Sequence, residues 1–418
     1  MGCVGPSGRV GRAGVAMATD DARSAPKAGL APWLVALVAA VLLFWWPATD
    51  RLDLPKQVIW LAGALGLGVA VWWRRRLEPD AVSVGLALAA VALLLLRPAE
   101  TAARVEGWAG WLAAVALVWL ARPLSARALR PWLARLGVGL AALAWLQAAG
   151  LEVFNAGLAA FGGRRVVGTL GNPGLFGCVL ALLLPWVGDR AAAREQRPGR
   201  GRWWGRVGLA LLAGALVLSG SRSAWVMGLV GLPAWLRRRG LAALLLALAA
   251  GAGLGAGLDA AGGRARLAER LDDLQQPGGT AAGRLYIWRV ALFNAGDLIG
   301  PGHGPEGFAR RWPHWQRAYL AAHPQQAHFA SDLRHAHADA VELLCDWGPA
   351  GALLVAWLLA LALLRPAARA RWRGPALGVL AAAAAGAVAA PVVFFAPCLA
   401  LVALALGSRL GPVRWRLP

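Results

Sequence analysis

The residues best suited to chemistry lie in one polar interval, Asp259–Asp339. It contains all six histidines and both tyrosines of the chain, whereas the remainder is mostly Leu, Ala, Val, Gly and Trp. Near its end stands the pair His335 and His337, separated by a single alanine. Imidazole rings act as general bases near neutral pH or bind metal ions. Because no third ligand stands at a familiar spacing from the pair, the sequence favours a general base over a metal site, with two histidines of no role as the alternative.

Arginines beside breaks between apolar segments indicate an anion. Arg222 in Ser219–Trp225 (SGSRSAW) lies between two apolar segments with no acidic residue nearby in the sequence. Such an arginine costs about 2.5–3.5 kcal/mol in hydrocarbon, so it usually faces a cavity or a partner; structural anchoring is the alternative. Arg284 stands at the N-terminal end of Gly283–Leu292, a stretch whose apolar residues predict a helix lying in the membrane interface. The free N–H groups at that helix start would favour the same anion.

A glycine-rich segment before the predicted sixth span adds weaker candidates. Arg164 and Arg165 precede Gly168–Gly174 (GTLGNPG), where glycine and proline free backbone N–H groups to face a ligand. An ordinary turn between two spans is the alternative interpretation. The substrate-binding candidates are therefore Arg164, Arg165, Asn172, Arg289 and Asp339.

Blocks of apolar residues indicate a membrane protein. The chain of 418 residues is 59% hydrophobic and only 15% charged. About 18 apolar residues in a row match the roughly 30 Å hydrocarbon layer of a bilayer. The candidate spans lie near 30–46, 57–73, 81–96, 107–121, 132–151, 168–188, 207–219, 224–236, 241–258, 340–364, 375–390 and 392–407. Since two are short and the last two nearly touch, we expect an all-α polytopic protein with about ten to twelve transmembrane helices.

The charge pattern predicts the orientation. The formal net charge is +22, and well over half of the basic residues fall in one alternating set of loops, as the positive-inside rule requires. This argues against nucleic-acid binding and places both termini in the cytoplasm. The predicted organisation is a disordered tail over 1–29, nine helices over 30–258, a large periplasmic loop over 259–338, three helices over 339–407 and a tail over 408–418.

Cysteine usage and the N-terminal residues exclude other classes. The four cysteines show no C-x-x-C spacing, so neither a metal centre nor a disulfide framework is predicted. The first thirty residues lack the apolar core of a cleavable signal peptide, and translation could begin at Met17.

Four stretches in order resemble a known family. They are Gly168–Gly174, Ser219–Trp225, Gly283–Trp288 (GRLYIW) with Gly302–Phe308, and His335–Glu342 (HAHADAVE). Together with the topology they resemble the O-antigen ligase and O-antigen polymerase superfamily of bacterial membrane glycosyltransferases. The resemblance spans roughly Arg164 to Gly351, and topology alone supports the remainder.

This resemblance implies a many-helix fold in the inner membrane with a periplasmic loop over the active site. It also implies metal-independent transfer of a glycan, with inversion, from an undecaprenyl-diphosphate carrier to an acceptor hydroxyl such as that of lipid A-core. The family's essential arginines correspond to Arg222 and Arg284, which would stabilise the leaving diphosphate. Its essential histidine corresponds to His337 or His335, with His337 the first choice, although Ala338 stands where the family usually has asparagine.

Three alternatives stay open at this point. A glycan polymerase of the same family would differ only in its acceptor, and we favour the ligase. A protein-glycosylating relative is disfavoured because no soluble domain follows the last predicted span. A secondary transporter also fits twelve spans and a central arginine, but transporters usually show two related halves, and this sequence shows no such repeat.

Overall fold

A computed structural model describes most of the chain. The described residues are 30–43, 53–73, 102–151, 165–196, 199–234, 240–261, 280–304, 306–364, 374–388, 390, 392, 394 and 396–410. The predicted tail over 1–29, the predicted span near 81–96 and Arg164 lie outside them, as does most of the tail over 408–418.

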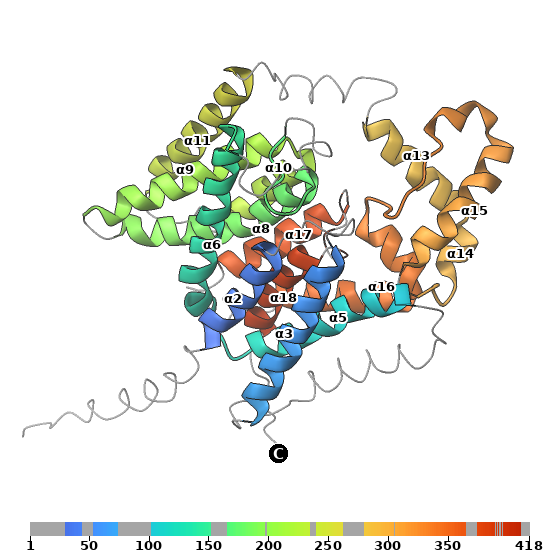
Figure 1. The fold of residues 1–418 in the computed structure, drawn as a ribbon, viewed down its shortest axis with the longest axis horizontal. Coiled ribbons are helices and arrows are strands. Elements are labelled where there is room, and N and C mark those ends of the chain that lie inside the picture. Colours follow the sequence, from blue (N-terminus) through green and yellow to red (C-terminus); the bar gives the residue numbers. More distant parts are fainter. Residues whose placement is uncertain are drawn as a thin grey trace, which may run out of the picture.

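Within these ranges the regular structure is entirely helical (Figure 1). The helices before the site are α2 (Leu30–Leu43), α3 (Asp53–Trp73), α5 (Ala102–Ala121), α6 (Ala126–Ala148), α8 (Pro173–Glu195), α9 (Gly201–Ser219), α10 (Arg222–Gly231), η1 (Leu232–Ala234) and α11 (Leu241–Ala261). The polar interval contributes α13 (Thr280–Phe293), α14 (Ala295–Ile299), α15 (Gly307–Ala322) and η2 (Pro324–Phe329). The last helices are α16 (Asp339–Leu364), α17 (Pro375–Gly386) and α18 (Ala396–Leu410). The predicted all-α class is confirmed for the described chain.

Helix α8 is the centre of the helical bundle. It is apolar on all sides, and nearly all of its residues from Pro173 to Ala192 are buried, as expected of a helix surrounded by others. It packs against α6, α9, α10, α17 and α18. Because other helices pack around α8, the glycine-rich segment that leads into its first turn is anchored to the centre of the bundle.

Three described helices are long and apolar enough to cross a membrane: Pro173–Glu195, Leu241–Ala261 and the Asp339–Trp357 part of α16. Shorter apolar helices lie at Leu30–Leu43, Gly110–Ala121, Pro375–Gly386 and Pro397–Leu410. Each predicted span within the described residues has a helix at its place. A multi-pass membrane protein is therefore supported, while the number of spans and the side on which the polar interval lies stay predictions.

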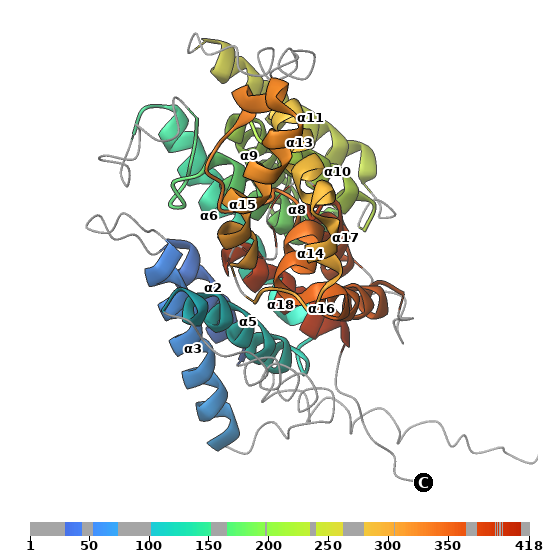
Figure 2. The same cartoon turned by 90° about the vertical axis from the view of Figure 1, so that its right-hand side faces the viewer.

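The polar interval folds around a core of its own. Its buried residues include Tyr286, Phe308, Trp312, Trp315 and Tyr319 from α13 and α15. The Tyr286 ring meets the Trp312 and Tyr319 rings edge to face, with centroids 6.1 and 5.8 Å apart, a favoured aromatic geometry. Figure 1 shows this unit at the right, next to α16, against which α14 and α15 pack, and Figure 2 turns it toward the viewer. The described residues between Thr280 and Ala338 thus form a compact helical unit, which we call the cap, and it can hold side chains in fixed positions.

Helix α13 divides its apolar residues between two surroundings. Val290 and Ala291 are buried in the core of the cap, whereas Leu285 and Leu292 are 48% and 69% exposed. The predicted helix is present but begins at Thr280, so the prediction that Arg284 stands at its N-terminus is wrong, and Arg284 lies in the second turn. Part of the apolar face of α13 packs against α15. The exposed Leu285 and Leu292 are compatible with a helix in the membrane interface, and that location stays a prediction.

Candidate active site

The turn between α9 and α10 presents Arg222. Helix α9 ends at Gly220, whose φ of 59° is left-handed, a conformation that glycine adopts without strain. Ser221 then caps α10 by accepting a hydrogen bond from the backbone N–H of Ala224, at 3.4 Å. Arg222 is consequently the first residue of α10. Its side chain therefore extends from a helix N-terminus, where backbone N–H groups already favour an anion.

Arg165 holds this turn from the neighbouring segment. Its Nε and Nη2 donate to the carbonyl oxygen of Ser219, at 2.9 and 2.7 Å. The last carbonyl groups of a helix have no hydrogen-bond donor within the helix, and Arg165 supplies a charged donor to one of them in α9. We predicted Arg165 as a substrate ligand; the structure places its guanidinium on the protein backbone, two residues before Ser221.

The glycine-rich segment is held by Gln147 of α6, which the sequence did not single out. The buried amide of Gln147 accepts from Gly168 N at 2.9 Å and donates to Gly168 O at 3.0 Å. Asn172 caps α8 by accepting from Gly174 N at 2.8 Å and Leu175 N at 3.2 Å. The Asn172 oxygen therefore serves the helix start, a common function for asparagine.

The two histidines lie on the segment that enters α16. Their neighbours Ala336 and Ala338 are buried, and His337 has a φ of 54°. This left-handed conformation is unusual for a residue with a side chain, and such residues collect at functional sites. Asp339 fixes the segment against the last helices: its backbone N–H donates to Ala387 O at 2.8 Å, and its Oδ2 accepts from Val392 N at 3.1 Å. Asp339 thus fixes the segment in place, and its function as a substrate ligand stays a prediction.

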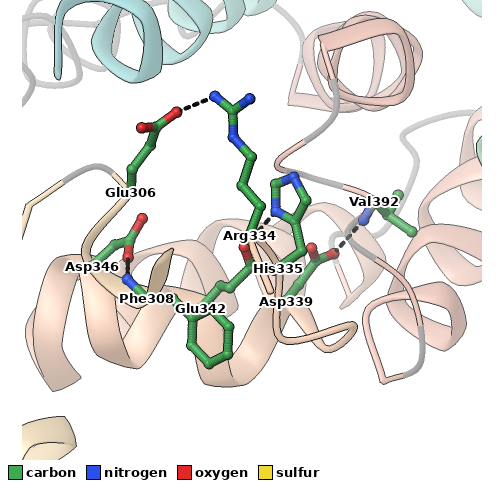
Figure 3. Close-up of polar contacts among 8 residues, drawn as sticks. All are labelled: Glu306, Phe308, Arg334, His335, Asp339, Glu342, Asp346 and Val392. Carbon is green, nitrogen blue, oxygen red and sulfur yellow. Dashed lines mark hydrogen bonds and ion pairs between the residues drawn. The ribbon is translucent and has the colours of Figure 1, made fainter. Parts of the chain in front are cut away.

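His335 is paired with Glu342. Its Nδ1 lies 2.7 Å from Glu342 Oε1, and the carboxylate is only 3% exposed while the histidine side chain is 37% exposed. Figure 3 shows the imidazole directed at this carboxylate, with the Arg334–Glu306 ion pair beside it. Residue Glu342 stands seven positions after His335, in the first turn of α16. The contact could not be read from the sequence, because it forms only when the segment that carries His335 folds back along the first turn of α16.

A second contact locks the cap onto α16. The N–H groups of His303 and Gly304 donate to the carbonyl oxygens of Cys345 and Asp346, at 2.7 and 2.8 Å. The Asp346 carboxylate accepts from Phe308 N at 3.1 Å, as Figure 3 shows. We call the segment 302–308 the clasp. It joins the cap by hydrogen bonds to α16, the helix that carries Glu342 and directly follows the histidine segment.

Electrostatic interactions connect the arginines and histidines predicted as catalytic in sequence: Arg222 acts on Arg284, and Arg284 and His335 act on His337. Burial lowers the pKa of Arg284, and the positive charge of Arg222 lowers it further. Burial lowers the pKa of His337 to about 4, with further lowering from the charges of Arg284 and His335. His337 is therefore neutral at pH 7, as a general base must be. The structure thus brings Arg222, Arg284, His335 and His337 together from three separate segments.

For the weaker candidates the structure shows other surroundings, and substrate binding by them stays a prediction. Arg289 is exposed on α13, and Arg165, Asn172 and Asp339 support the backbone as described above. Among the described residues, no three His, Cys, Asp or Glu side chains gather to hold a metal ion. Catalysis without a metal stays a prediction.

Comparison with known proteins agrees with the motifs. Residues 207–356 match the protein-family model described as O-antigen ligase. The match begins in α9 and ends in α16, so it contains Arg222, Arg284, both histidines and Glu342. A search of curated proteins found no relative. The match supports the resemblance drawn from the sequence over residues 207–356, which contain three of the four stretches; Gly168–Gly174 lies outside it.

Proposed function

We propose that the protein is a ligase-type glycosyltransferase. It moves a glycan from an undecaprenyl-diphosphate carrier to an acceptor hydroxyl of lipid A-core, at the periplasmic face of the inner membrane. The observation that carries this proposal is the meeting of Arg222, Arg284 and a neutral His337 inside the matched region. A polymerase, with a growing glycan as acceptor, is the second candidate because the family includes both.

The two arginines are suited to the diphosphate. The positive charge of Arg222 acts on the partly buried Arg284, and an anion beside the two side chains would offset that repulsion. Guanidinium groups bind phosphate oxygens through paired N–H donors. As the bond from the anomeric carbon to the diphosphate breaks, its electron pair passes to the diphosphate, and the arginines stabilise that added charge.

His337 is suited to the acceptor hydroxyl. Its neutral ring takes the hydroxyl proton while the acceptor oxygen forms its bond to the anomeric carbon. The bound diphosphate offsets the charge of Arg284, which raises the pKa of His337 when the substrate is in place. The general base thus gains proton affinity at the step that needs it. Attack from the face opposite the diphosphate would invert the anomeric carbon, as the family resemblance implies.

Binding of the carrier tests the arginine assignment directly. Purified protein in nanodiscs is titrated with undecaprenyl diphosphate, a probe that carries the anion without the glycan. Arg222→Ala and Arg284→Ala should each weaken binding at least tenfold. Arg317→Ala, an exposed arginine on α15, is the matched control and should bind as the wild type does. Equal binding by all four proteins would contradict the proposal.

A further inference from the structure

The His335–Glu342 pair has a geometry that the proposed function leaves unused. Glu342 is 3% exposed and lies 2.7 Å from the Nδ1 of His335. Burying a carboxylate is costly unless a donor or a cation compensates it, and the imidazole is the compensating group here. A ring that donates Nδ1–H to a carboxylate has its lone pair on Nε2 and is fixed in that tautomer. Nε2 is then a proton acceptor of defined direction.

The His335–Glu342 pair also lies on a route from His337 to water, along which the acceptor proton can leave the site. Once His337 has taken the acceptor proton, its positive charge lies within the field of the positive charge of Arg284. That ring must lose the proton before the next transfer. His335 is 37% exposed, so it connects this site with water, whereas burial is the main influence on His337.

We propose that Glu342 positions His335 as the second member of a proton relay, in which His337 receives the acceptor proton and His335 carries it to solvent. The relay rests on the proposed function. In the first step the acceptor O–H proton moves to His337, while one C–O bond forms and the bond to the diphosphate breaks. In the second step that proton moves from His337 to Nε2 of His335, and the Glu342 carboxylate offsets the charge. Release to water then restores both neutral rings.

Several other charged groups surround the pair and enter any pH dependence. Figure 3 shows Glu306, Arg334, Asp339 and Asp346 near it, and the negative charge of Glu342 acts on Asp346. Glu306 is bound to Arg334, the residue before His335. Among the described residues, these charged groups are Arg284 of α13, Glu306 before α15, Arg334 and His337 of the same segment, and Asp339 and Asp346 of α16.

The positioning part is tested without any substrate. The histidine rings are labelled with ¹³C, and His335 is assigned through His335→Gln, then titrated by NMR in nanodiscs. Glu342→Gln keeps an oxygen that accepts from Nδ1–H but removes the charge, so the titration midpoint of His335 should move about one pH unit lower. Glu306→Gln is the matched control, because it removes a nearby carboxylate that is bound to Arg334; its midpoint should stay near that of the wild type. An unmoved midpoint in Glu342→Gln overturns the positioning role.

The relay part is tested by turnover and its rescue. His335→Ala should lower glycan transfer at least tenfold, and added imidazole should restore part of it by carrying the proton in place of the missing ring. Full activity of His335→Ala, or a loss that imidazole does not restore, overturns the relay. Wild-type activity in His337→Ala would instead contradict the proposed function, while the NMR result for Glu342 would stand. The two failures are therefore distinguishable.

Discussion

The charge of Arg284 adds to the effect of burial in lowering the pKa of His337, and removing that charge has a measurable consequence. With a pKa of about 4, only about one His337 ring in a thousand is protonated at pH 7, compared with about one in four for an unperturbed histidine. Burial is the first cause of this lowering and Arg284 the second. Arg284→Gln keeps a polar side chain but removes the charge. We expect the midpoint of His337 to rise by about 0.5–1 pH unit, and not to reach 6.5, because burial is unchanged.

The same shift affects stability, with a defined sign. The pKa of His337 is lower in the fold than in the unfolded chain, so the unfolded state binds the proton first as the pH falls. His337 therefore destabilises the fold as the pH drops from about 6.5 to about 4, by at most about 3 kcal/mol. Above pH 7 it has no such effect. In Arg284→Gln, about 1 kcal/mol of this acid-induced loss should disappear.

The assay is a histidine NMR titration in nanodiscs, combined with thermal unfolding at pH 7 and pH 5. Arg289→Gln is the matched control, since it removes an exposed arginine from the same helix. Its His337 midpoint should equal that of the wild type. If Arg284→Gln leaves the His337 midpoint unchanged, or if both variants shift it equally, the electrostatic account of the site is wrong.

Three further substitutions test the supports of the site. Arg165→Ala removes both N–H donors from the Ser219 carbonyl oxygen, so the thermal midpoint should fall by several °C through a loss of about 1.5–3 kcal/mol; an unchanged midpoint would refute the capping role. Gly302→Ala places a Cβ against the backbone of Asp346 at a φ of 83°, so it should release the clasp, visible as faster amide exchange in α15, and lower transfer; wild-type exchange would show that the clasp is not essential. Asn172→Ala removes the α8 cap at a cost of about 1 kcal/mol, and transfer should be nearly unchanged at a temperature where the variant is folded; a large loss of transfer would make Asn172 a substrate ligand.

The bundle helices could be predicted because their signal is local. Runs such as Leu241–Ala261 are apolar over their full length, and length and composition alone define such a helix. The fold of the cap is not a local property. Tyr286, Trp312 and Phe329 belong to three separated segments, and no periodicity indicates that they form one core.

The chemistry could be predicted by residue type but not by arrangement. Arg222 and His337 were found because arginine and histidine are rare and conspicuous among apolar residues. Gln147 was missed because a single glutamine in a span carries no sequence signal until its amide meets Gly168. Glu342 was missed as a partner because its contact with His335 depends on the left-handed turn at His337.

The most direct test of the central claim is a complementation assay in a host that lacks its own ligase or polymerase. The glycan ladder on lipopolysaccharide is read for His337→Ala, Arg222→Ala and Arg284→Ala, with His314→Ala and Arg317→Ala as exposed controls on α15 and membrane levels matched. We predict that the three site variants lose the ladder by a factor of about 100 or more while both controls retain it. If the inactive variants leave lipopolysaccharide without any attached glycan, the wild-type protein is a ligase. If they leave single repeat units attached, the wild-type protein is a polymerase. A full ladder from all three site variants would contradict the assignment of this site as the catalytic centre.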